Sequence, residues 1–130
     1  MAVENFDYPH ASQILTEQGI KLIKGDGHIL VADCAEAADI KVQTSLIHPG
    51  QTTRGQYCFK VTGSGKSGFL ALELPKVYNI ITGDVAVSAD VTADGTKQTV
   101  EVAENGIKGV GVAGTPPTGP AVLVELRVKG

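Results

Sequence analysis

The segment that comes closest to a known chemical motif is Gly63-Ser64-Gly65-Lys66-Ser67, which ends in the Gly-Lys-Ser of phosphate-binding loops. The full motif has a glycine five positions before Gly65, where this chain has Lys60. The motif also needs a helix after the loop, because the amide groups at a helix N-terminus hold the phosphates. Here the loop leads into Phe69-Leu70-Ala71-Leu72, which is typical of a strand. We therefore interpret the segment as a Gly/Ser turn with a solvated lysine.

Nucleophilic catalysis or metal binding would depend on the three histidines, His10, His28 and His48. A triad needs a Ser or Cys within reach of a histidine that a carboxylate orients, and the chain has no Gly-x-Ser-x-Gly elbow. No two histidines have the close spacing that puts two metal ligands on one element, although separate strands could still bring them together. We predict no catalytic residues, no metal site and no cofactor.

Two cysteines, Cys34 and Cys58, are the remaining reactive side chains. They would form a disulfide in an oxidising compartment, and otherwise they would be two buried free thiols. The low Lys and Arg content and the abundant Gly, Thr and Val favour an exported β-domain, with Met1-Ala2 interpreted as a start codon placed on a mature chain.

The composition excludes several classes of protein. Of the 130 residues, 42% are hydrophobic and 19% are charged, which is typical of one globular domain and not of a disordered chain. The net charge is −3 with no basic block, so we expect no nucleic-acid partner. No run approaches the roughly 18 apolar residues of a membrane helix, so we expect no membrane span.

The elements that would position these residues are mostly strands. Short apolar runs with a period of two, separated by Gly, Pro and Asp, predict eight or nine strands and an antiparallel β-sandwich or flattened barrel. The candidate segments are 20–24, 28–34, 40–44, 56–62, 69–74, 77–81, 85–92, 98–102 and 121–128, and 107–112 is a candidate for a further short strand. We expect one domain, residues 1–130, with a single short helix at about 9–18 that ends at Gly19.

Turn residues give the expected connections between these strands. The Gly/Ser loop after residue 62 predicts a central hairpin of 56–62 with 69–74, and Pro75 is expected to end the second strand. Gly25-Asp26-Gly27 and Asp94-Gly95 predict two further hairpin turns, the latter of type I′. In 85–92 the apolar residues alternate with Ser88, Asp90 and Thr92, which are expected to face water.

Two features could serve recognition. One is the loop Thr115-Pro116-Pro117-Thr118-Gly119-Pro120, which proline stiffens, so that little entropy is lost when a partner docks. The other is an exposed sheet edge, which can accept a partner's strand through main-chain hydrogen bonds. The candidate edge strands are 85–92 and 121–128, unless either of them is central.

The chain also resembles a group of small secreted actinobacterial β-rich proteins of uncharacterised function. The resemblance covers Phe6-Asp7-Tyr8-Pro9-His10-Ala11, the segments 25–34 and 57–63, and the closing 123–128. It implies export, a Cys34–Cys58 bridge and a β-rich fold, and it implies no activity. The segment 47–55 departs from the pattern because it is longer than expected.

These observations together predict a secreted, non-enzymatic protein-binding module that uses a rigid loop or a sheet edge. Its partner would be another secreted protein, as in an adaptor of an extracellular assembly or an inhibitor of a secreted hydrolase. We expect a monomer or a component of a hetero-complex. Two alternatives stay open: a β-barrel that binds a small ligand or a carbohydrate, and an enzyme whose site is assembled from distant strands.

Overall fold

The computed structural model describes residues 6–36, 39–51, 53–62 and 67–129, so most of the Gly/Ser/Lys turn lies outside the described residues. The predicted all-β fold with one short helix is confirmed. In chain order the elements are β1 Phe6–Asp7, α1 Ala11–Gln18, β2 Lys21–Gly25, β3 Ile29–Ala32, β4 Ile40–Thr44, β5 Gln56–Val61, β6 Ser67–Thr82, β7 Ala86–Ala93, β8 Thr96–Val102, β9 Ile107–Gly109, the 3-10 turn η1 Gly111–Ala113 and β10 Ala121–Lys129.

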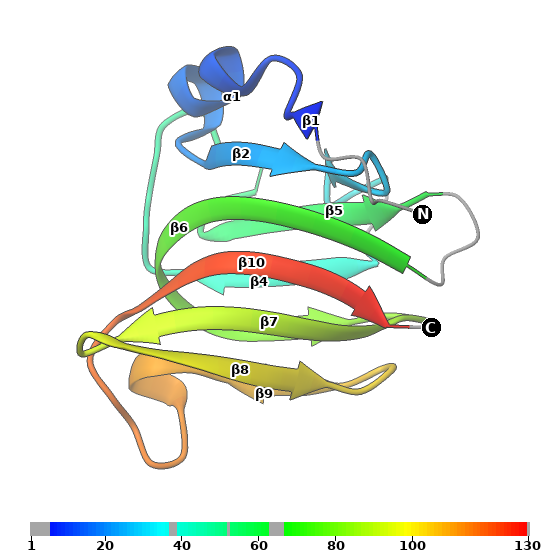
Figure 1. Cartoon of the computed structure of the whole chain (residues 1–130). Coiled ribbons are helices and arrows are strands. Elements are labelled where there is room, and N and C mark those ends of the chain that lie inside the picture. The colour runs from blue at the N-terminus through cyan, green and yellow to red at the C-terminus, as the bar shows by residue number, and fades with distance from the viewer. Residues whose placement is uncertain (1–5, 37–38, 52, 63–66, 130) are drawn as a thin grey trace.

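The strands form one continuous antiparallel sheet that folds into two layers (Figure 1). The front layer has the order β1-β2-β6-β10-β7-β8, and the rear layer has the order β3-β5-β4-β6-β9. Strand β6 belongs to both layers. Among the described residues no ladder joins β8 to β9, so the sheet stays open at that margin.

The double role of β6 depends on a bend at Pro75 and Lys76. Pro75 was predicted to end the strand, but β6 continues through it, because the irregular pairing at this point needs no proline N–H. Lys76 has a φ of 58°, which turns the chain. The hydroxyl of Thr44 donates to the Pro75 carbonyl at 2.7 Å and fastens the bend to β4.

Two predicted hairpins are wrong. Strand β5 pairs with β3 and β4 and not with β6, because β4 occupies the place beside the second half of β6. Likewise β2 pairs with β1 and β6, whereas β3 pairs with β5, so Gly25-Asp26-Gly27 carries the chain from one layer to the other. In both cases the turn residues in the sequence do not specify which strands pair.

The core lies between the layers, and both layers contribute to it. Leu70, Leu72 and Leu74 of β6 face Phe59 of β5 and neighbouring residues in one continuous apolar cluster. Helix α1 closes one end of this cluster through Ala11 and Ile14. The helix ends at Gly19, which has a φ of 78° and donates to the Leu15 carbonyl. The predicted helix is thus confirmed with a start two residues later.

A buried threonine holds the turn that links the layers at the open margin. Thr82 ends β6, and its hydroxyl donates to the Ala103 carbonyl and accepts from the N–H of Gly106 at 3.0 Å. The N–H of Thr82 donates to the Gly106 carbonyl at 2.9 Å. The turn between β8 and β9 is therefore fastened to the rear layer.

The Thr82→Val substitution should lower the free energy of unfolding by about 1–3 kcal/mol, because it leaves the Gly106 N–H and the Ala103 carbonyl without their side-chain partner. Urea titration followed by circular dichroism measures this loss. Thr62→Val is the matched control, since the Thr62 hydroxyl also donates to a carbonyl, that of Gly27, but at an exposed position. An equal loss in both variants would contradict the role given to Thr82.

Candidate functional site

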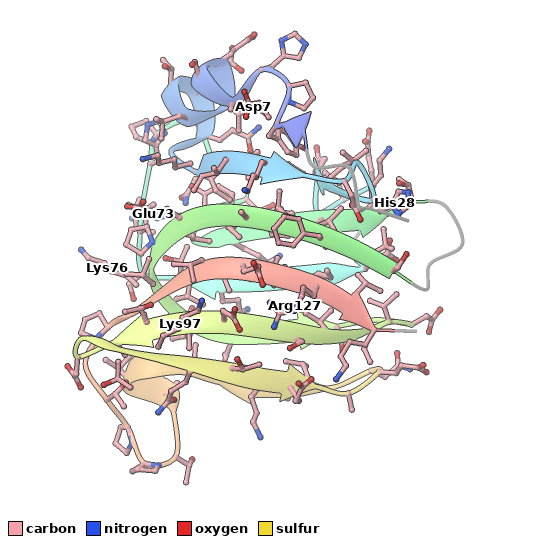
Figure 2. The ribbon with its side chains drawn as sticks, in the orientation of Figure 1. Asp7, His28, Glu73, Lys76, Lys97 and Arg127 are labelled. Atoms are coloured by element: carbon pink, nitrogen blue, oxygen red, sulfur yellow. A yellow bond between two sulfur atoms is a disulfide. The ribbon has the colours of Figure 1, made fainter. Side chains whose placement is uncertain are left out.

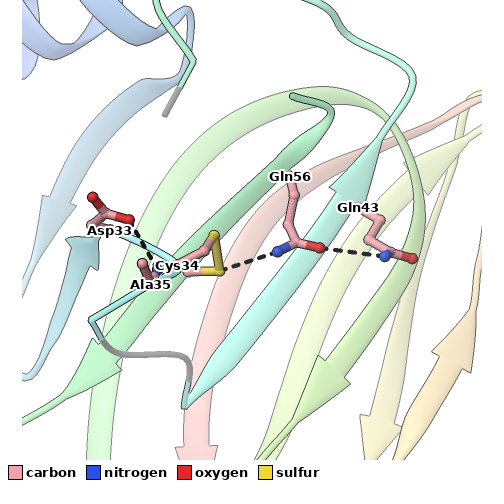
Figure 3. The surroundings of a disulfide bond; sticks show 6 residues. Asp33, Cys34, Ala35, Gln43 and Gln56 are labelled. Carbon is pink, nitrogen blue, oxygen red and sulfur yellow. Dashed lines mark hydrogen bonds between the residues drawn. A yellow bond between two sulfur atoms is a disulfide. The ribbon is translucent and has the colours of Figure 1, made fainter. Parts of the chain in front are cut away.

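The disulfide between Cys34 and Cys58 is present, which confirms that prediction (Figure 3). Cys58 lies on β5 opposite Ala32 of β3, and Cys34 follows the end of β3, so the Cα atoms are 5.1 Å apart. The turn after Asp33 is held by its carboxylate, which accepts from the Ala35 N–H at 2.9 Å. The bridge thus closes the outer edge of the rear layer.

A row of amide side chains runs from the disulfide across the rear layer. The Gln56 amide donates to Cys58 Sγ at 3.6 Å and accepts from the Gln43 amide at 3.4 Å, as Figure 3 shows. The Asn79 amide in turn donates to Gln43 at 2.9 Å. Gln43 and Asn79 each donate to an amide on the neighbouring strand, and Gln56 donates to the disulfide on its own strand, so we interpret this row as a structural link across the rear layer.

The predicted recognition loop, 115–120, connects η1 to β10, and two hydrogen bonds fasten it near its C-terminal end. The Thr118 N–H donates to the Gly111 carbonyl at 2.8 Å, and the Gly119 N–H donates to Asp94 at 3.1 Å. Asp94 belongs to the turn between β7 and β8, so the loop is fastened to that hairpin. Pro116 and Pro117 lie exposed just before these two anchors.

Gly111 sets the direction in which the loop leaves β9. It is buried with a φ of 58°, and a Cβ placed on it would lie 2.8 Å from the amide nitrogen of Ala121. Any other residue would need both a left-handed conformation and space that β10 occupies. The backbone conformation of Gly111 therefore fixes the direction in which the chain leaves β9 toward the loop.

The loop forms one wall of a hollow of about 320 Å³ at the open margin of the sheet. The opposite wall is the inner face of the β7–β8 hairpin, and β9 forms the floor. The polar side chains around it are Thr96, Gln98, Lys108, Thr115 and Thr118. These hydroxyl, amide and ammonium groups can bind carbonyl, hydroxyl or carboxylate groups of a ligand.

A second, smaller hollow of about 170 Å³ also borders the segment 111–120. Val112 and Pro120 line it together with Ser45, Lys76 and Val77. Val112 is 58% exposed, which is unusual for a valine held in a short turn by backbone hydrogen bonds. The segment 111–120 therefore borders two hollows, and Val112 and Pro120 give the smaller one part of its apolar lining.

The predicted edge strands are both central, which corrects that prediction. Strand β7, which covers most of 85–92, pairs with β10 and β8, and β10 pairs with β6 and β7. The edge next to them is β8, which pairs only with β7 in the described part of the chain. Apolar alternation identified the buried face correctly, but it does not distinguish a central strand from an edge.

The three histidines lie apart. His10 precedes α1, the His48 ring packs against Gly19 at the other end of that helix, and His28 follows the corner between β2 and β3. No group of three or more His, Cys, Asp or Glu side chains with metal-binding proximity occurs within the described ranges. None of the helices in those ranges has the length and apolar composition needed to cross a membrane.

A charged network covers the outer face of β10, β7 and β8, where Figure 2 shows Arg127 and Lys97. Asp90 of β7 was expected to face water, but its side chain is only 7% exposed. Arg127 binds both carboxylate oxygens of Asp90 at 3.2 Å, and the Thr99 hydroxyl donates to it at 2.8 Å. Lys97 lies 3.6 Å away.

Burial acts to raise the pKa of Asp90, but the hydrogen bonds from Arg127 and Thr99 and the charges of Arg127 and Lys97 outweigh it. The pKa of Asp90 therefore lies below its ordinary value of 3.8. The network continues through Ser88, which accepts from Arg127, to Glu101 and Lys129. Arg127 also pairs with Glu125. Every carboxylate in this network has a cationic or hydroxyl partner, so the network stabilises the face.

Sequence reasoning missed Gln98, Lys108 and Val112 as components of the candidate site. Gln98 and Lys108 come from β8 and β9, which do not pair with one another in the described part of the chain, so no local pattern brings both to the loop. A usable signal existed only for Val112, a valine among small residues next to a proline-rich loop. Comparison with known protein families and with curated proteins gives no match to this chain.

Removing the disulfide by the double substitution Cys34→Ser and Cys58→Ser should lower the free energy of unfolding by about 3 kcal/mol, because the bridge restricts the unfolded chain over 24 positions. Urea titration of the oxidised protein and the double variant measures the loss. Reducing agent should destabilise the wild type equally and leave the variant unchanged. Equal stability of both proteins would contradict the entropic role of the bridge.

Asp90→Asn should lower the free energy of unfolding at pH 7 by about 1–3 kcal/mol, since charged hydrogen bonds to Arg127 are lost. The contribution of Asp90 is fully present above its unfolded pKa of 3.8 and is lost as the pH falls through its lower folded pKa. The wild type and variant should therefore converge in stability below pH 4 in urea titrations across pH. Glu73→Gln, which breaks an exposed pair with Lys21 at 3.8 Å, is the control and should change stability little.

Proposed function

We propose that the chain is an extracellular, non-enzymatic module that binds another protein through the segment 111–120. The observation that carries this proposal is that the segment is exposed at most of its residues, stiff, and anchored near its C-terminal end. The N–H groups of Thr118 and Gly119 donate to Gly111 and Asp94, and three prolines restrict the backbone directly before and after these two residues. A segment that is already ordered loses little entropy on binding, so most of the contact energy contributes to affinity.

Val112 supplies the apolar contact that such an interface needs at its centre. Its exposure of 58% leaves most of the side chain available, and Pro120 extends the apolar surface beside it. Complete burial of a valine contributes about 1.5 kcal/mol or more. The polar rim would come from Thr115, Thr118 and Lys108 around the neighbouring hollow.

The disulfide supports an extracellular location. Structural disulfides persist in oxidising compartments and are rare in the cytosol. The pairing of β3 with β5 holds the two residues of the Cys34–Cys58 bridge next to one another. This position is typical of a structural disulfide and not of a reactive cysteine pair. A secreted partner, such as an assembly component or a hydrolase that this chain inhibits, follows from that location.

A second candidate function is the binding of a small polar ligand or a carbohydrate. The hollow of about 320 Å³ favours it, because hydroxyl, amide and ammonium groups converge there. The space between the layers is filled by the apolar core, so the ligand would lie at the open margin and not inside a barrel.

The Val112→Lys variant tests the proposed function. Immobilised wild type should retain a specific protein from the culture medium, and Val112→Lys should weaken that binding about tenfold or more, because it replaces the central apolar contact. Leu15→Lys is the matched control, since Leu15 is also an exposed apolar residue, 43%, and lies on α1 at the opposite end of the molecule in Figure 1. Surface plasmon resonance with the purified partner measures both variants.

An inhibitor would lower the hydrolytic activity of the captured protein, whereas an adaptor would leave it unchanged. Equal binding by wild type and Val112→Lys would place the interface elsewhere. A glycan array that gives a hit abolished by Gln98→Ala, together with no retained protein, would favour the second candidate. Cleavage of a substrate by the wild-type chain alone would contradict the non-enzymatic proposal.

A further inference from the structure

Strand β8 is an edge strand of seven residues whose far side has no partner in the described part of the chain. In Figure 1 it forms the lower margin of the front layer, with β9 behind it. Most of its residues are exposed. Unpaired N–H and C=O groups along such an edge are a template for another strand.

The turn between β7 and β8 fixes which residues of β8 present these groups. Asp94 and Gly95 both have positive φ, 52° and 76°, and form the predicted two-residue turn that Ala93 and Thr96 close. In such a hairpin the closing pair is hydrogen-bonded, and pairs then alternate along the ladder. Gln98 and Val100 therefore direct their N–H and C=O groups toward β7. Lys97, Thr99 and Glu101 direct theirs toward the free edge.

The charges on these three residues are self-complementary. If two β8 strands run antiparallel and meet at Thr99, Lys97 of each lies opposite Glu101 of the other. Centring the pair on Lys97 would oppose two lysines, and centring it on Glu101 would oppose two glutamates. Only the register centred on Thr99 both uses the free backbone groups and places each of these two charges opposite one of the other sign.

We propose that two copies of the chain form a homodimer through antiparallel pairing of their β8 strands about Thr99. The two-fold axis is perpendicular to the front layer, so the outer faces of both copies lie on the same side. Hydrogen-bonded pairs at Lys97–Glu101, Thr99–Thr99 and Glu101–Lys97 join the two front layers into one sheet. This inference is independent of the proposed function and differs from the expectation of a monomer or hetero-complex.

The surroundings of β8 favour a second copy as the occupant. Glu101 already contacts Lys129 at 3.3 Å on the β10 side, and Lys97 lies 3.6 Å from Asp90 on the β7 side. The dimer places a charge of opposite sign on the remaining side of each. Ile107 of β9, 62% exposed, adds apolar surface at the same margin. An edge that avoided pairing would instead present charges of one sign to its own copy.

A charge-reversal pair of variants tests the homodimer. Lys97→Glu gives an edge with two acidic residues, and Glu101→Lys gives an edge with two basic residues. Each variant alone should dissociate about tenfold or more readily than the wild type, because both cross-strand charge pairs become repulsive. An equimolar mixture should associate as the wild type does, because each acidic edge then meets a basic one. Sedimentation equilibrium over a concentration series measures all three samples.

Hydrogen exchange gives a second readout with residue resolution. The N–H groups of Lys97, Thr99 and Glu101 should exchange quickly in dilute protein and slowly at high concentration. Those of Gln98 and Val100 should be protected at both concentrations, because β7 holds them. The proposal would be overturned if the wild type stayed monomeric up to about 1 mM, because a dissociation constant of that size corresponds to a binding free energy of only about 4 kcal/mol. A dimer that the variants do not weaken, or that mixing does not restore, would also overturn it.

Discussion

The hydrogen bonding of both layers to β6 is the constraint on which the rest of the structure depends. In its first half β6 lies between β2 and β10, and in its second half between β4 and β9. The irregular pairing at Pro75 and the left-handed conformation of Lys76 allow one strand to serve both layers. Because the two layers share this strand, their relative position is fixed and the apolar faces of both can bury one another.

The ends of the folded sheet need further support, because β6 holds only its middle. On the rear layer the Cys34–Cys58 bridge ties the edge strand β3 to β5. At the opposite margin Thr82 holds the turn between β8 and β9. Asp94 fastens the recognition loop to the turn at the other end of β8, so the part of the molecule that we propose to bind partners is built on well-supported elements.

At the open margin between β8 and β9 the fold leaves a hollow and a strand edge accessible to other molecules. The layers diverge there because β8 continues the front layer whereas β9 joins the rear one. The divergence creates the hollow beside the loop, and it also leaves the backbone of β8 without a partner on one side. A binding loop and a pairing edge can therefore occur together without altering the core.

Local features of this protein were determined by its sequence alone: the β class, the stop of the helix at Gly19, the turn at Asp94-Gly95, the buried face of 85–92 and the exposure of the proline loop. Each depends on the conformational preference of a few adjacent residues or on a period of two. The tertiary structure decided the pairing of the strands, the edge position of β8, the burial of Asp90 beneath Arg127 and the hollow formed with Gln98 and Lys108. A strand takes its hydrogen-bond partners from residues far away in the chain, and its alternation specifies which face is buried but not which strand lies beside it.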